Sequence, residues 1–328
     1  MIDRRQALLG TLAAGLAARI EAQTAPPHVA GARVPADPTE TIDLWPAGAP
    51  GLPATPPVEV VEDRSTDAGF ADRAVRGITR PRLAVFRPVQ PNGAALLVTP
   101  GGGYQRIVLD KEGYEIGRWL AARGWTVFVL FYRLPGDGWA AGPDVALSDA
   151  QRAMRLIRAR AGTYGIRADR VAAMGFSAGG HLCGDLATRF AAATYTPVDA
   201  ADRLSARPDL AAPIYAVQSM TAPLAHPGSR ELLIGKQASA ALEAAHSPAR
   251  HVTAQTPPCF LVHAEDDNVV PVENSLQFRA ALKAAGMPVE THLFAQGGHG
   301  FGLRRAAGKP VEAWPTLFAA WAASHGFG

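Results

Sequence analysis

The stretch "VAAMGFSAGGHL", residues 171–182, places one serine among small residues, between an apolar run and a run suited to a helix. At a tight turn from a strand into a helix, the two backbones pass so close that the positions two before and two after the turn residue must be small. Gly175 and Gly179 occupy these positions around Ser177. The pattern predicts a turn that presents the Ser177 hydroxyl over the edge of a sheet. The alternatives are a plain helix N-cap and a glycine-rich phosphate-binding turn.

Apolar runs alternate with helix patterns on both sides of this stretch. Near-continuous apolar strands are predicted over 94–100, 125–133, 170–176, 209–217, 258–264 and 288–295, and helices over 113–124, 144–165, 273–286 and around 314–326. Strands of this kind, lacking polar alternation and separated by helices, indicate an α/β fold with a mostly parallel sheet covered on both faces. We expect early edge strands in "VEVVEDR" and "RPRLAVFRP", and an insert around 218–256 that covers the site.

The N-terminal 25 residues have the pattern of an export signal. Arg4 and Arg5 precede an apolar run over 7–18, and small residues follow. The run is shorter than the roughly 20 residues needed to span a bilayer, and the paired arginines are typical of a twin-arginine signal. This predicts a periplasmic or secreted protein without a stable membrane anchor after processing; the alternative is a retained N-terminal helix. A Pro/Ala-rich leader over 26–57 and one domain over 58–328 complete the predicted organisation.

The composition excludes several classes of function. The 328 residues carry a formal net charge of only +3, without a basic run interleaved with aromatics, so nucleic acid is not an expected partner. The two cysteines, Cys183 and Cys259, lie in apolar runs; we expect two buried free thiols, with a disulfide as the alternative. The histidines lack ligand spacing, and neither a metal nor another cofactor is predicted. Oligomeric state does not follow from these features.

The chain supplies a base and an acid for Ser177 downstream of it. "AEDDNVVP" follows the strand 258–264, and His299 lies between glycines after the last strand. The order serine, acid, histidine is the one expected when all three lie on loops at the carboxyl ends of successive strands. A hydroxyl needs such a base to remove its proton and an acid to orient the base. Both Asp266 and Asp267 compete for the acid role, and the Asp-x-x-Val-Pro spacing favours Asp267.

A negative oxygen formed at an attacked carbonyl needs amide donors. The amide of Ala178, directly after the serine, is one candidate. The glycines of "TPGGGYQ" follow an early strand and can turn backbone amides inward, so Gly101 and Gly102 are the others. A merely flexible turn is the alternative for these glycines.

The motifs "PGGGY", "GFSAGGHL", "HPGSRELLIG", "FLVHAEDDNVVPVENS" and "GGHGFGL" resemble the α/β-hydrolase carbohydrate esterases, which include acetyl xylan esterase-like enzymes. The resemblance covers roughly residues 75–305 in the same order. It implies hydrolysis of short acyl esters, with acetyl on xylan-type carbohydrates expected, by Ser177, His299 and Asp267 without a cofactor. Thr99 departs from the family, where a histidine that braces the loop usually precedes Pro-Gly-Gly-Gly.

Several features of the sequence have two interpretations. Feruloyl or general short-chain carboxylesterase, exopeptidase and non-catalytic carbohydrate-binding protein are the alternative functions. Tyr104 is a candidate either for stacking on substrate or for the core, and His226 and Arg230 either line the entrance or brace the insert. Two pairs are expected to be structural, His181 with Asp185 and Asp149 with Arg152.

Overall fold

The computed structural model describes residues 36–66 and 69–328. The predicted export signal, residues 1–25, lies outside the described residues. Residues 26–35, the first part of the predicted leader, also lie outside them. No helix in the described ranges combines the length and apolar character needed to cross a bilayer.

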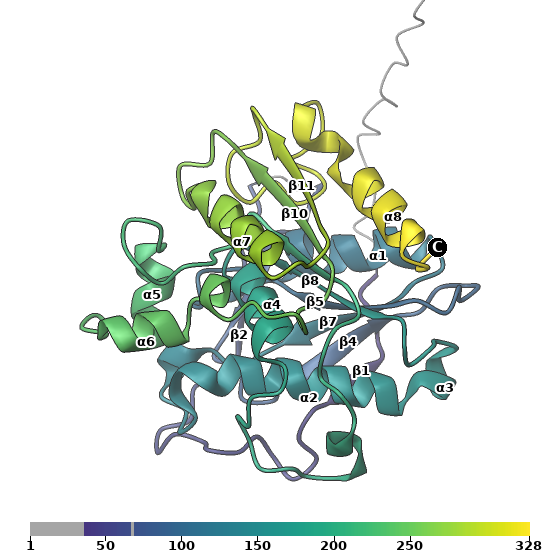
Figure 1. Ribbon diagram of the computed structural model, residues 1–328. Helices are drawn as coiled ribbons and strands as arrows, with labels where there is room; N and C mark the ends of the chain where they lie inside the picture. Colours follow the sequence, from purple (N-terminus) through teal and green to yellow (C-terminus); the bar gives the residue numbers. More distant parts are fainter. Residues whose placement is uncertain (1–35, 67–68) are drawn as a thin grey trace, which may run out of the picture. The chain divides into compact units, whose positions relative to one another are not determined.

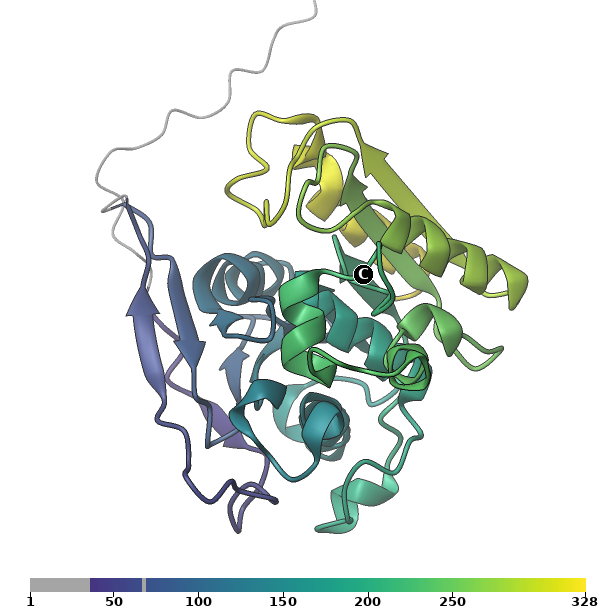
Figure 2. The same cartoon turned by 90° about the vertical axis from the view of Figure 1, so that its left-hand side faces the viewer.

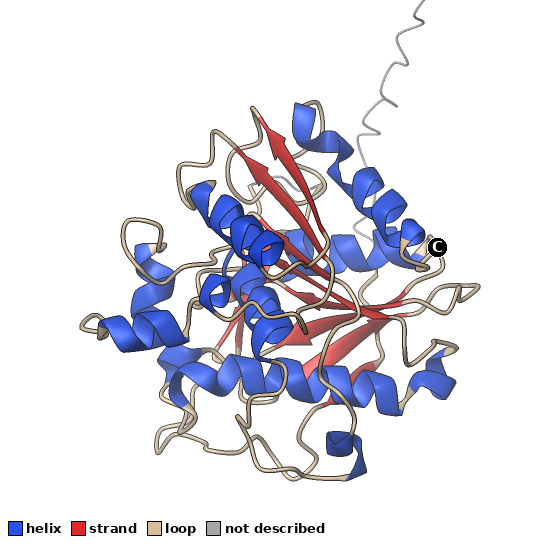
Figure 3. Ribbon diagram, in the orientation of Figure 1, coloured by secondary structure: helices blue, strands red, loops and turns tan. Residues whose placement is uncertain are grey.

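An eight-stranded sheet forms the centre of the described domain (Figures 1 and 3). All of its strands run in one direction except β4, which is antiparallel to both neighbours. This confirms the predicted α/β fold with a mostly parallel sheet. The strand order is β1 (Thr41–Asp43), β4 (Arg82–Phe86), β7 (Thr126–Phe131), β5 (Ala95–Thr99), β8 (Val171–Phe176), β9 (Ala211–Ile214), β10 (Cys259–Ala264) and β11 (Val289–Phe294).

Helices cover both faces of the sheet. The longer helices α2 (Val145–Ala159), α4 (Ser177–Arg189) and α7 (Glu273–Ala284) lie on one face, and α1 (Glu115–Ala121) and α8 (Trp314–Ser324) lie on the other (Figures 1 and 2). The predicted helix over 144–165 is interrupted after α2, and its end forms the single turn α3 (Ala161–Tyr164). The insert carries α5 (Pro227–Ile234) and α6 (Ala240–Ala245).

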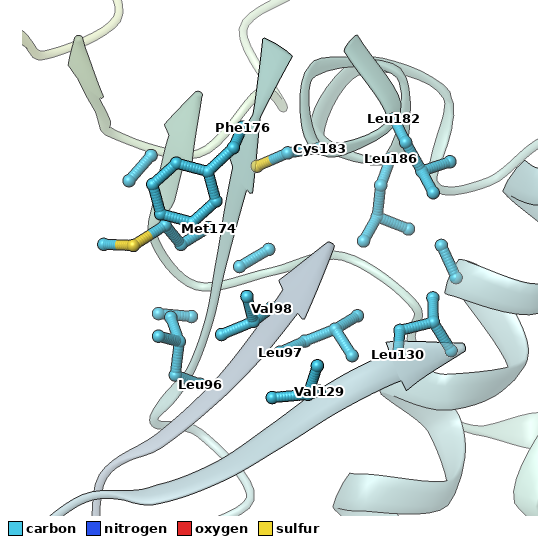
Figure 4. Close-up of a cluster of buried hydrophobic side chains, with 14 of the residues drawn as sticks. Leu96, Leu97, Val98, Val129, Leu130, Met174, Phe176, Leu182, Cys183 and Leu186 are labelled. Atoms are coloured by element: carbon cyan, nitrogen blue, oxygen red, sulfur yellow. The ribbon is translucent and has the colours of Figure 1, made fainter. Parts of the chain in front are cut away.

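The core lies around the two central strands, β5 and β8, whose residues are all buried. Figure 4 shows leucine and valine side chains of β5 and β7 packed beneath Met174 and Phe176 of β8, with Leu182 and Leu186 of α4 beside them. A sheet buried on both faces needs apolar residues at every position, which explains why these strands read as continuous apolar runs. Cys183 and Cys259 are buried free thiols, as expected.

The N-terminal part of the fold differs from the expectation. "VEVVEDR" does not join the main sheet; its strand β2 (Val60–Asp63) forms a separate three-stranded antiparallel sheet with β3 (Arg73–Arg76) and β6 (Ile107–Val108). Within the expected leader, β1 pairs with β4. The main sheet therefore begins before residue 58, where we expected the domain to start.

The prediction that Asp149 and Arg152 form an ion pair is wrong. Asp149 instead pairs with the buried Arg133, at 2.7 Å, and also accepts a hydrogen bond from the Trp45 indole. Arg152 reaches the opposite way and binds Asp199 and Asp202. The two residues share a helix, but Asp149 faces the end of β7, whereas Arg152 faces the segment before β9.

Candidate active site

Ser177 lies at the junction where β8 ends and α4 begins, and its φ of +53° falls in the left-handed region. A non-glycine residue there costs about 1–3 kcal/mol, so the surrounding packing must hold it. A Cβ on Gly175 would lie 2.1 Å from the Gly179 carbonyl oxygen, and one on Gly179 would lie 2.1 Å from the Thr99 carbonyl oxygen. The glycines are therefore required by close backbone contact, as the sequence pattern predicts.

Three loops at the carboxyl ends of β8, β10 and β11 bring a serine, an aspartate and a histidine together. The distance from Ser177 Oγ to His299 Nε2 is 2.9 Å. The distance from His299 Nδ1 to Asp267 Oδ2 is 2.7 Å. Because the carboxylate accepts the proton on Nδ1, Nε2 is left as the acceptor for the serine hydroxyl.

Asp267 is held by several donors and is nearly buried. Its Oδ1 accepts hydrogen bonds from the amides of Val269 and Val270, each at 2.9 Å. Burial opposes its ionisation, but hydrogen bonds from His263 and His299 outweigh burial and hold the pKa of Asp267 well below its ordinary value. The carboxylate is therefore charged at neutral pH and fixed in orientation.

Asp266 has a different task. Its Oδ1 accepts the amides of Gly297 and Gly298, at 2.9 and 2.7 Å, and so orders the loop that carries His299. Of the two competing acids, the structure thus places Asp267 against the histidine and Asp266 against the backbone.

In the glycine loop after β5, one of the amides expected to bind the negative oxygen, that of Gly101, is not available for that role. The amide of Gly101 already donates to Glu112 Oε2, at 2.9 Å, and is not free to bind another oxygen. Among the described residues, the amides of Gly102, Gly103 and Ala178 have no hydrogen-bond acceptor. Gly102 has a φ of +130°, and a Cβ there would lie 2.2 Å from the Arg106 carbonyl oxygen, so only glycine fits.

Glu112 connects this loop to the histidine side of the site. Its Oε1 accepts the Tyr215 hydroxyl at 3.1 Å, and that hydroxyl oxygen accepts the Gly302 amide at 3.2 Å. The Tyr215 ring packs edge-on to the His299 ring, with 5.2 Å between centroids. Glu112 therefore links the glycine loop to the tyrosine that packs against His299, and it makes no hydrogen bond with Ser177 in the described structure.

Two further hydroxyls hold the same region. Tyr132 donates to the Pro100 carbonyl at 2.7 Å. Thr99, at the position where the family usually has histidine, donates to the Gly179 carbonyl at 2.8 Å and so ties β5 to the first turn of α4. The loop is braced by these contacts and by Glu112 in the absence of the histidine.

A cleft of about 510 Å³ opens at the serine. Its lining includes Ser177, His299, Gly102, Gly103, His226 and Leu232. His226 also accepts the Ser229 amide and caps α5, so it lines the cleft and braces the insert at once. Within the described ranges, no group of three or more side chains has an arrangement suited to a metal ion.

Tyr104 and Arg230 are not placed to contact a substrate. Of the two interpretations given for each residue, the structural one is confirmed. Tyr104 is 1% exposed, and its hydroxyl lies 2.6 Å from His181 Nδ1, so it belongs to the core. Arg230 binds Glu243 at 2.7 Å and braces the insert. His181 does not pair with Asp185, which binds Arg189 instead.

Three residues of the site, Glu112, Tyr215 and His263, could not be identified from the sequence pattern. Glu112 and Tyr215 lie 103 residues apart, and His263 lies inside an apolar strand. The charged "DKE" at residues 110–112, which follows the apolar run "IVL" in a largely buried segment, is the one signal that points to Glu112.

Comparison with known proteins identifies relatives of the chain. Residues 90–282 match the model of the BD-FAE family. The chain is 32% identical over 229 residues to an acetylxylan esterase of Xylanibacter ruminicola, covering 68% of this chain and 44% of that protein. It is 36% identical over 205 residues to endo-1,4-beta-xylanase B of Butyrivibrio fibrisolvens, covering 62% and 32%. The chain thus spans less than half the length of these two relatives.

Solved structures extend the likeness to most of the chain. An acetyl ester-xyloside bifunctional hydrolase from Caldicellulosiruptor lactoaceticus is 33% identical, with a TM-score of 0.72 over 89% of this chain and 98% of that one. Esterase 2 of Thermogutta terrifontis, at 23% identity and a TM-score of 0.63 over 86% and 98%, shares the fold. The chain belongs to the BD-FAE family and is an acetyl xylan esterase-like α/β-hydrolase.

Proposed function

We propose that this protein is a carboxylic ester hydrolase whose nucleophile is Ser177. The observation that carries the proposal is the continuous hydrogen-bonded chain from Ser177 through His299 to Asp267. His299 Nε2 accepts the hydroxyl proton as Oγ bonds to the acyl carbon, and the charged Asp267 stabilises the resulting imidazolium. His299 then gives that proton to the leaving alcohol.

The amides of Gly102 and Ala178 receive the negative oxygen, and Gly103 lies beside them. Each is free among the described residues. Ala178 directly follows the serine in α4, and Gly102 lines the same cleft as the serine. Donors fixed before reaction stabilise the tetrahedral intermediate by about 3 kcal/mol each. Water, deprotonated by His299, then attacks the acyl-enzyme and releases the acid.

The proposed substrate is a short acyl ester, with acetyl groups on xylan-type carbohydrate as the expected case. Relatives named for acetyl xylan ester and xyloside hydrolysis support this assignment. The cleft has room for a sugar beside a small acyl group, since about 510 Å³ falls within the usual range for small-molecule sites.

Such a polymer substrate would be met outside the cytoplasm, and we propose that residues 1–25 direct export. The paired Arg4 and Arg5 before the apolar run support a twin-arginine route. Fractionation of cells expressing the full chain tests this, with Arg4→Lys/Arg5→Lys as the variant. Mature protein outside the cytoplasm that disappears in the variant supports export; equal cytoplasmic retention of both contradicts it.

The experiment that tests the function measures acetate released from acetylated xylo-oligosaccharides and from a chromogenic acetyl ester. The wild-type protein should cleave both, and Ser177→Ala should cleave neither above background. Cleavage of the simple ester alone would keep the chemistry and reject the carbohydrate substrate. A wild-type protein inactive on every ester, or an active Ser177→Ala variant, would contradict the proposal.

A further inference from the structure

The cleft that contains the serine is lined by four basic side chains, Arg64, Arg106, Lys111 and Arg305. Two of them have counter-charges at the surface. Arg64 pairs with Asp72 at 2.9 Å, and Arg106 lies 3.7 Å from Glu62. Lys111 and Arg305 have no ion pair or side-chain hydrogen bond with any residue in the described ranges.

Lys111 is an unusual lysine because it is only 7% exposed. Buried lysines are rare unless they are paired. A Cβ built on Gly300 would lie 3.1 Å from Lys111 Nζ, so the ammonium lies against the loop that carries His299. Burial is the main cause that lowers the pKa of Lys111; the nearby charge of Glu112 opposes this shift, and that of Arg305 adds to it. The ammonium thus has no ion-pair partner among the described residues, and it lies at the wall of the cleft, where it keeps contact with solvent.

Neither carboxylate beside Lys111 in the chain supplies that partner, and Asp110 pairs with Arg73 instead. Both oxygens of Glu112 are engaged, one with the Gly101 amide and one with the Tyr215 hydroxyl. No ion pair joins Glu112 to Lys111 in the described structure. Among the described residues that line the cleft, Glu112 is the one carboxylate, so the basic side chains outnumber it.

We propose that this cleft takes esters that carry a carboxylate, and that Lys111 and Arg305 bind that group. The inference rests on the proposed ester hydrolysis and narrows its substrate class. A carboxylate on the alcohol part would come from an acidic sugar such as a uronate, and one on the acyl part from the half-ester of a dicarboxylic acid. A neutral substrate that displaces water from this wall of the cleft would leave the Lys111 ammonium without a counter-charge among the described residues, which is costly.

Matched esters test the proposal by differing in one charge. The first pair is 4-acetoxybenzoate and 4-acetoxybenzamide, with the charge on the alcohol part; the second is 4-nitrophenyl hemiadipate and its primary amide, with the charge on the acyl part. We expect kcat/KM to favour the charged member of one pair by about tenfold or more, and that pair identifies the side.

Charge-removing variants assign the effect to the two residues. Lys111→Met and Arg305→Gln should each lower the charged-to-neutral ratio of kcat/KM about tenfold. Lys283→Met and Arg279→Gln remove the same charges from the exposed side of α7 and should leave the ratio unchanged. Ratios near one for both pairs, or equal losses in the α7 variants, would overturn the proposal.

Binding separates this inference from the catalytic one. Calorimetry with Ser177→Ala compares a glucuronate-bearing xylo-oligosaccharide and adipate with a neutral xylo-oligosaccharide of equal length. Tighter binding of an acidic ligand, lost in Ser177→Ala/Lys111→Met, supports the charged subsite even if the wild-type protein cleaves no ester. Binding of neither acidic ligand beyond the neutral one rejects the subsite while leaving ester hydrolysis intact.

Discussion

Replacement of Glu112 by glutamine perturbs the backbone around the serine without a change in side-chain volume. In the wild-type protein, the carboxylate accepts two hydrogen bonds from opposite sides, from the Gly101 amide and from the Tyr215 hydroxyl. Glutamine offers one acceptor oxygen, and its NH₂ group faces a donor at the other position. One of the two donors therefore loses its buried acceptor, which weakens the hold on either the glycine loop or Tyr215.

The magnitude follows from the type of bond that is lost. A hydrogen bond to a charged group contributes about 1.5–3 kcal/mol. In the variant, most of this free energy no longer holds the glycine loop in place. If the shift weakens the oxyanion contacts by the same amount, kcat falls about 10- to 150-fold, since 1.36 kcal/mol is a factor of ten. KM should change little, because Glu112 holds the backbone that meets the oxyanion.

The assay is steady-state hydrolysis of 4-nitrophenyl acetate, with Glu115→Gln as the matched control. Glu115 is a largely buried carboxylate in the same segment, but it pairs with Arg304 and does not contact the glycine loop. The control should stay within about twofold of wild type. Wild-type kcat in Glu112→Gln, with a folded protein by circular dichroism, would refute the bracing role.

Three further predictions concern the acid, the elbow and a buried histidine. Asp267→Asn should lower kcat by about 10³–10⁴-fold in the same assay, whereas Asp266→Asn, which keeps an acceptor for the loop amides, should lower it less than about tenfold; similar losses would contradict the assignment. Gly179→Ala places a Cβ against the carbonyls of Thr99 and Pro100 and should cost about 3 kcal/mol in urea unfolding, whereas Gly162→Ala, with open space, should cost nothing. Burial lowers the pKa of His181 from 6.5 to about 4, so between these values the unfolded chain binds more protons than the folded one. Stability should therefore fall by up to about 3 kcal/mol as pH drops from 6.5 to 4, and His181→Gln should remove that part of the loss; an unchanged pH dependence in the variant would contradict it.

The sequence predicts the elbow and the meeting of the three loops because each leaves a local signature. Close backbone contact excludes side chains at Gly175 and Gly179, and this steric demand is visible in five consecutive residues. The chain order of Ser177, Asp267 and His299 follows from their positions after parallel strands. In such a sheet, the carboxyl ends of the strands share one edge, so the order alone indicates proximity.

The bracing contacts lack such a signature. The Gly101 amide is directed to Glu112 rather than to a substrate because the carboxylate folds back under the loop, and nothing in "PGGGYQ" shows this. The partner of Asp149 is Arg133 at the end of a neighbouring strand, not Arg152 on its own helix. In both cases the partner is chosen by tertiary packing, which spacing along one element cannot show.

The short strands at the edge of the sheet are the other feature that the local sequence pattern does not predict. β1 comprises only Thr41–Asp43, in a segment rich in proline and alanine. It forms a strand because its backbone pairs with β4. β3 and β6 are likewise short and pair with each other rather than with the main sheet. Such strands depend on their neighbours more than on their own apolar pattern.

We assign Ser177 as the nucleophile and His299 as the base that activates it. The most direct measurement is the site of covalent modification by a fluorophosphonate, found by intact mass and peptide mapping, with the rate of labelling followed in parallel. We predict one adduct per chain on the peptide that contains Ser177, no adduct in Ser177→Ala, and labelling slowed at least about 100-fold in His299→Gln. An adduct on another residue, or undiminished ester hydrolysis by the Ser177→Ala protein, would contradict it.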